Sequence, residues 1–145
     1  LKYFYAYFNA VEKAIAPFVK EVLPDYTQRR NASYLKADIE SLGHTIHELP
    51  PAIAPEIGTA AEAIGSLYVL EGSIMGGPYI IQLLQKRGID KGFSFFSGYG
   101  ADSGRMWRTF QEALDKTDED QEAGDQAMQK AAETFERFGN MFGVD

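Results

Sequence analysis

The chain has 145 residues, a formal net charge of −7 and no cysteine. This length fits a single domain over residues 1–145, and the negative charge argues against non-specific nucleic-acid binding, which needs a basic surface. The lack of cysteine excludes disulfides, zinc–thiolate sites and cysteine nucleophiles. No apolar run approaches the roughly 20 residues of a membrane span. We therefore expect a soluble, cytoplasmic protein.

The first predicted helix is amphipathic and begins almost at the first residue. Spacings of three and four place its apolar side chains on one face: Phe4, Phe8, Val11, Ile15, Phe18 and Val22. Pro17 should kink this helix and Pro24 should end it. Because the chain opens at Leu1 inside the pattern, we interpret its N-terminus as trimmed or partly observed, with residues missing upstream.

A second helix is predicted over residues 29–42, with Asp38 on its polar side and Gly43 as its C-terminal stop. Its inward-facing side chains should be Leu35, Ile39 and Leu42. Residues 44–55 contain three prolines and should form an irregular connector.

A long third helix is expected over residues 56–87, ended by Gly88. It should bend and then continue, because it holds a cluster of residues unfavourable in a helix interior: Gly72, Gly76, Gly77 and Pro78. Residues 92–100 form the next connector. Two further helices carry apolar side chains at helical spacing, the fourth Met106, Phe110 and Leu114, and the fifth Met128, Ala131, Phe135, Phe138 and Phe142. No stretch alternates long enough to predict a strand, so the fold class is all-α.

The glycines of the third helix suggest a binding surface. Gly72 and Gly76 lie four residues apart and share a face, and with Gly77 they leave one patch without side chains, which allows a flat molecule to approach the backbone. Pro78 lacks an N–H, so the Ile74 carbonyl should lose its helical partner and become available to a water or a ligand. The alternative is that the glycines only let two helices cross closely.

The stretch Tyr68-Val69-Leu70-Glu71-Gly72-Ser73-Ile74-Met75-Gly76-Gly77 closely resembles the distal-helix signature of bacterial heme oxygenases, especially those that accompany bacteriophytochromes. Other stretches are similar in order and spacing: Phe4-Tyr5-Ala6-Tyr7-Phe8 with Glu12, Gln28-Arg29-Arg30, Leu35-Lys36-Ala37-Asp38-Ile39, Leu42-Gly43, Phe95-Phe96-Ser97-Gly98-Tyr99-Gly100, Trp107-Arg108-Thr109-Phe110 and Phe135-Glu136-Arg137-Phe138. The likeness covers nearly the whole chain.

This resemblance implies a helical bundle that binds heme and opens it to biliverdin, carbon monoxide and iron. Gly72, Gly76 and Gly77 match the distal glycines that let backbone approach the heme, and Gly72, Ser73 and Gly76 are the implied catalytic positions. Ser73 stands where many animal-type relatives have an aspartate that organises water. A serine hydroxyl can donate and accept a hydrogen bond, but it supplies no carboxylate.

The resemblance also implies residues around the edge of the heme. Arg108 and Arg105 match basic positions that pair with the propionates, although both could equally be a solvated helix face. Phe135 matches an aromatic side chain that lines the pocket, with ordinary core packing as the alternative. Glu71 is expected to be a hydrogen-bonded structural acid.

The family takes its iron ligand from a histidine on a helix that would precede Leu1. His44 and His47 are the chain's two histidines, and they lie in or beside the proline-rich connector, where we expect exposed loop residues. No residue of the chain is therefore assigned to the metal. A heme oxygenase would also need an electron donor, such as a ferredoxin or a reductase, and the likeness suggests a bacteriophytochrome as a partner.

Three interpretations remain open at this point. The first is a biliverdin-forming heme oxygenase without its first helix. The second is a heme oxygenase-like tetrapyrrole-binding or structural protein that has lost iron ligation. The third is an unrelated helical bundle whose glycines serve packing.

Overall fold

The computed structural model describes residues 1–29 and 31–142, and within them it contains helices and no strand. The all-α prediction is confirmed. Arg30, part of one stretch of the resemblance, lies outside the described residues. The elements are α1 (Lys2–Val19), η1 (Tyr26–Gln28), α2 (Ala32–Ser41), α3 (Ala60–Gly72), α4 (Gly77–Lys86), η2 (Gly100–Asp102), α5 (Ser103–Asp118) and α6 (Gln121–Met141), where η marks a short 3₁₀ helix.

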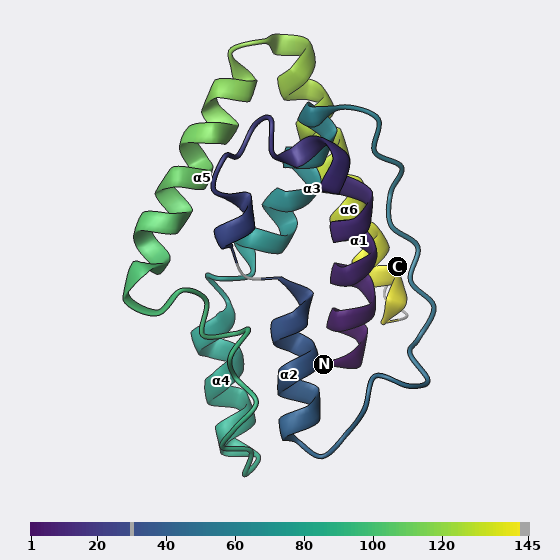
Figure 1. Ribbon diagram of the computed structural model, residues 1–145, viewed down its shortest axis with the longest axis vertical. Coiled ribbons are helices and arrows are strands. Elements are labelled where there is room, and N and C mark those ends of the chain that lie inside the picture. Colours follow the sequence, from purple (N-terminus) through teal and green to yellow (C-terminus); the bar gives the residue numbers. More distant parts are fainter. Residues whose placement is uncertain (30, 143–145) are drawn as a thin grey trace.

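Helix α3 forms the centre of the molecule and packs against α1 and α6 (Figure 1). Its closest approach to α6 is at Gly65, where an added Cβ atom would overlap the backbone of Ala127. Thr134 of α6 joins all three helices, because its carbonyl accepts from the Tyr7 hydroxyl at 2.6 Å and its hydroxyl lies 2.8 Å from that of Ser66. The tight crossing therefore depends on Gly65, which the sequence analysis did not single out.

Helix α1 places most of its predicted stripe in the core. Phe8, Val11 and Ile15 are buried, and the other members of the stripe pack against the core while partly exposed. The helix includes Pro17 and ends at Val19, before the predicted stop at Pro24. Its end follows the proline closely because Pro17 has no N–H to continue the hydrogen-bond ladder.

Helix α2 begins at Ala32 rather than at residue 29. Asn31 is its N-cap and accepts a hydrogen bond from the Ser33 N–H at 2.9 Å. The placement of Asp38 on a polar face was wrong: Asp38 is 3% exposed, and its carboxylate accepts from the backbone N–H groups of Ser94 and Phe95, both at 2.9 Å. A loop distant in sequence supplies the donors that make this burial possible.

The predicted third helix is two helices separated by a turn. Thr59 caps the start of α3 by accepting from the Glu62 N–H, and Pro78 stands in the first turn of α4, where its missing N–H has no helical partner to lose. The Ile74 carbonyl accepts from the Gly77 N–H at 3.3 Å, so the expectation that it lacks a partner was also wrong. The chain turns at residues 73–76 instead of bending within one helix.

The long connector between α2 and α3 runs along one side of the molecule, and α2 and α4 occupy the same end (Figure 1). By length and composition alone, the stretch Ala60–Lys86 could cross a membrane, with a mean hydropathy of 1.2 over its most apolar window. Its α3 part packs in the core and buries the carboxylate of Glu71. Its α4 part is mostly exposed, with Gly77 as its buried residue.

Candidate functional site

A cavity of about 550 Å³ lies between the end of α3 and helix α6, and we call it the slot. Helices α1 and α5 supply its remaining walls. Its lining is almost wholly apolar: Phe4, Phe8, Tyr68, Val69, Gly72, Ser73, Met75, Trp107, Ala131, Ala132, Phe135 and Phe138. Ligand cavities typically measure about 300–1,000 Å³ and combine apolar walls with few polar groups, so the slot has the size and character of a binding site.

The three glycines of the sequence pattern have different surroundings. A Cβ atom added to Gly72 would meet nothing within 4 Å, and one added to Gly76 would meet only the Ser73 carbonyl, at 3.9 Å. Gly77 is buried, and its added Cβ would overlap the carbonyl oxygen of Phe96. Of the two readings of the glycines, open surface therefore describes Gly72 and Gly76, whereas close packing describes Gly77.

Ser73 lines the slot beside Gly72. Its hydroxyl donates a hydrogen bond to the Leu70 carbonyl at 2.6 Å. The Ser73 backbone N–H donates to the same carbonyl at 3.3 Å, so the residue closes the end of α3 through both its backbone and its side chain.

Phe135 lines the slot and is 69% exposed. It is therefore a wall of the cavity and not an ordinary core side chain. Behind it, Phe138 forms part of an aromatic cluster, with its ring 5.0 Å from that of Phe4 and 5.2 Å from that of Tyr7. The exposed ring of Phe135 and the packed ring of Phe138 give the slot an aromatic lining, which suits a flat apolar ligand.

Trp107 is a slot residue for which the sequence suggested no individual role. Its ring lies 5.9 Å from that of Tyr68 and stacks on Phe110 at 5.6 Å. Tyr68 and Val69 were missed as well. Their distances of four and three residues before Gly72 put them on its helical face, a signal that the sequence does contain.

Arg105 and Arg108 project from the exposed side of α5, and neither lines the slot. Arg105 lies 3.6 Å from Asp102 in an exposed pair. Helical geometry puts the two arginines on faces of α5 other than the one from which Trp107 lines the slot. Their expected contact with propionates stays a prediction.

Glu71 is buried, as expected, directly before Gly72. Its carboxylate accepts from Arg29 Nη1 at 2.9 Å and from the Tyr99 hydroxyl at 3.0 Å. Arg29 also binds Asp25 through Nε at 2.9 Å. Because Glu71 directly precedes Gly72, this buried network lies next to the part of α3 that lines the slot.

A second buried acid lies near this network. Glu12 accepts a hydrogen bond from the Ala32 N–H at 2.7 Å. Burial raises the pKa of its carboxyl to about 7, the Ala32 hydrogen bond opposes the rise, and the nearby Glu71 carboxylate adds to it. Glu12 therefore titrates near neutral pH.

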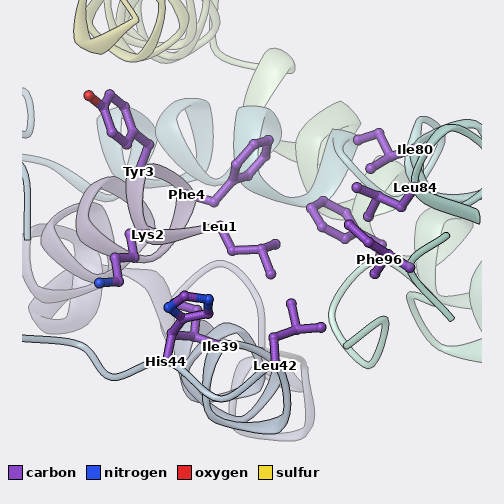
Figure 2. A pocket seen from close by; sticks show the side chains of 11 residues that line it. Leu1, Lys2, Tyr3, Phe4, Ile39, Leu42, His44, Ile80, Leu84 and Phe96 are labelled. Carbon is purple, nitrogen blue, oxygen red and sulfur yellow. The ribbon is translucent and has the colours of Figure 1, made fainter. Parts of the chain in front are cut away.

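The two histidines lie away from the slot, exposed in the connector between α2 and α3. His44 lines a separate apolar groove of about 620 Å³ between the start of α1, the end of α2 and α4 (Figure 2). In the part of the chain that the structure describes, no three His, Cys, Asp or Glu side chains gather as a metal site. The expectation that neither histidine binds the metal stays a prediction.

Comparison with known proteins identifies the family. The heme oxygenase family model matches residues 4–143. "Heme oxygenase PigA" from Pseudomonas aeruginosa is 27% identical over 122 residues, which cover 83% of this chain and 62% of the relative. "Heme oxygenase" from Xanthomonas campestris pv. campestris is 33% identical over 90 residues, which cover 61% of this chain and 52% of that relative.

The matched regions thus span between half and two thirds of the length of these relatives. No solved structure matches the chain. The family match itself extends over nearly every residue and includes each element that builds the slot. The chain therefore belongs to the heme oxygenase family.

Proposed function

We propose that this chain forms the distal part of a heme oxygenase, which binds heme in the slot and cleaves it to biliverdin, carbon monoxide and iron. The observation that carries the proposal is the open face of Gly72, where an added Cβ would meet no atom within 4 Å apart from its chain neighbours and the backbone of its own helix. Family membership identifies the flat guest, and both relatives carry the name heme oxygenase.

The slot residues fit the ring of a heme but supply no iron ligand. The backbone at Gly72 gives a flat surface, and Phe135 and Trp107 offer aromatic walls. No histidine is among the residues that line the slot. We propose that the histidine comes from a helix before Leu1, as the family resemblance implies, and that this helix closes the other face of the slot.

When bound, heme supplies the redox-active iron at which dioxygen is reduced and its own ring is oxidised. The chain's residues orient and enclose the ring. Gly72 keeps side chains off the distal face, and the apolar lining excludes bulk water. Gly76 does not line the slot in this structure, and its part in the site rests on the family resemblance. The Ser73 hydroxyl is the polar side-chain group that we assign to this face.

The remaining contacts are assigned from the surface around the slot. Gly77 supports the distal segment by packing against Phe96. Arg105 and Arg108 pair with the propionates if these extend along the exposed side of α5. An electron donor such as a ferredoxin or a reductase completes the reaction, a bacteriophytochrome is the proposed user of the bilin, and the cytoplasm is the proposed location.

A second candidate function is tetrapyrrole binding without cleavage. The observation that favours it is that Ser73 directs its hydroxyl proton to the Leu70 carbonyl, in a slot to which the described residues contribute no carboxylate or histidine side chain. The described lining of such a site holds a ring without an acid that ionises near neutral pH to deliver protons. It predicts heme binding that survives reductant and oxygen unchanged.

Titration of the full-length protein with heme, followed by turnover, separates these functions. We expect a one-to-one complex with a Soret band that shifts with exogenous imidazole, and conversion of the heme to a bilin when reductant and oxygen are added. Binding without a bilin product supports the second candidate. Absence of any complex contradicts both.

A further inference from the structure

We propose that Arg29 is a positioning residue for the slot: its guanidinium fixes the wall formed by the end of α3 relative to the wall formed by α5. The role concerns the shape of the slot in the protein itself, and its consequence for heme rests on the function proposed above. Arg29 touches neither the slot nor its guest.

The guanidinium of Arg29 is fully buried and bonded on several sides. Nε and Nη2 bind the two carboxylate oxygens of Asp25, at 2.9 and 3.2 Å. Nη1 donates to Glu71 Oε2 at 2.9 Å, and Nη2 donates to the Met106 carbonyl at 2.9 Å. A planar fork held by three partners has little freedom to rotate.

Two of these partners stand directly beside slot residues. Glu71 precedes Gly72 in α3, and Met106 precedes Trp107 in α5. One rigid group therefore connects the backbone positions next to the bare wall and the aromatic wall. A change in its size or geometry must shift one helix end against the other.

The place of Glu71 supports a positional role. It lies in the last turn of α3, where the helix dipole disfavours a negative charge. It is also 2% exposed, so the carboxylate has lost its hydration. Desolvation offsets much of the attraction in a buried ion pair. The main effect of the Arg29–Glu71 contact is therefore to fix the relative position of the two segments that it joins.

Tyr99 also binds the Glu71 carboxylate. Its hydroxyl donates to Glu71 from the connector that precedes α5. The Arg29 guanidinium carbon lies 6.0 Å from the Tyr99 ring centre and 5.9 Å from that of Phe110, the residue on which Trp107 stacks. These contacts extend the network from Arg29 to the back of the aromatic wall.

Trp107, the single tryptophan of the chain, gives a direct probe of this wall. The Arg29→Lys variant keeps the charge but cannot bind Asp25, Glu71 and the Met106 carbonyl together. In the heme-free protein we expect the acrylamide quenching constant of Trp107 to rise about twofold, because the wall loosens. Heme should bind about tenfold more weakly.

The matched control is Asp38→Asn, which alters another buried carboxylate bonded to a connector, away from the slot. It should leave Trp107 quenching and heme affinity unchanged. All proteins are compared at a temperature where circular dichroism shows them folded. If Arg29→Lys does not fold, Tyr99→Phe carries the test and should shift both readouts in the same direction.

A folded Arg29→Lys or Tyr99→Phe protein with wild-type quenching and wild-type heme affinity overturns the proposal. An equal change in Asp38→Asn overturns it too, because the effect would then reflect general loss of stability. If the wild-type protein binds no heme, the function proposed above fails, whereas Trp107 quenching still decides the positioning role.

Discussion

The backbone of Gly77 lies against the carbonyl oxygen of Phe96, in a contact so close that a Cβ atom at position 77 would overlap this oxygen. The contact holds the start of α4 against the connector that leads to α5. Gly72, five residues earlier in the chain, has no such neighbour and faces open space.

Alanine should therefore have opposite effects at these two glycines. We expect Gly77→Ala to lower the free energy of unfolding by about 1–3 kcal/mol, because the backbone of Phe96 must move. Gly72→Ala should be neutral or stabilising by up to about 1 kcal/mol, since alanine is the better helix former and meets no neighbour. Urea unfolding of the two variants checks this, and equal losses at both positions would refute the distinction.

Leucine at Gly72 should separate binding from folding. Its Cβ would meet no neighbour, and its side chain would extend into the slot, so we expect loss of the heme complex at nearly wild-type stability. Heme titration and thermal unfolding of Gly72→Leu measure the two effects, and Gly72→Ala is the control of smaller volume. A variant that binds heme normally would show that the guest does not lie on this face.

The titration of Glu12 gives a prediction for pH. Its carboxyl has an ordinary pKa of 4.5 in the unfolded chain and about 7 in the folded protein. Between these values the folded state keeps a proton that the unfolded state releases, so stability falls as pH rises from about 4.5 to 7. Glu12→Gln keeps an acceptor for the Ala32 N–H and should remove this fall. At pH 8 the free energy of unfolding of the variant should exceed that of the wild type by an amount on the order of 2 kcal/mol.

Urea unfolding at a series of pH values compares the two proteins. The histidines and the other carboxylates are common to both, so the difference between the curves isolates Glu12. Parallel curves for the wild type and Glu12→Gln would show that the carboxyl titrates normally in the folded state.

The guanidinium groups on α5 should contribute modestly to heme affinity. Arg108→Gln is expected to weaken heme binding by at most about fivefold, as for an exposed ion pair, with the loss reduced at high salt. Lys116→Gln, in the last turn of the same helix, is the control for a general change of charge. Equal affinities of Arg108→Gln and the wild type at low salt would place the propionates elsewhere.

Local patterns in the sequence were sufficient for much of the bundle. The stripe from Phe8 to Ile15 predicts the buried face of α1, because helical periodicity is a local property. The same reasoning, with the family resemblance, pointed to Gly72, Ser73 and Phe135, which all line the slot. Their chemical roles remain predictions.

Features that depend on distant partners were not predictable in this way. The burial of Asp38 requires hydrogen-bond donors 56 and 57 residues away in the sequence. Arg29 bonds to Glu71 and Met106, which are 42 and 77 residues away. Composition showed that Gly76, Gly77 and Pro78 disfavour a continuous helix. Composition did not distinguish a bend in one helix from the turn that the structure contains, because either one relieves the cost of placing glycine and proline in a helix interior.

The central claim, that the slot receives heme, is tested most directly by the fluorescence of Trp107. Heme placed between Gly72 and Phe135 would lie beside this indole, so titration of the full-length protein should quench its emission in one saturable one-to-one step, and Gly72→Leu should abolish the quenching. A Gly72→Leu protein that binds heme and loses Trp107 emission as the wild type does would contradict the claim, because the heme would then be bound elsewhere.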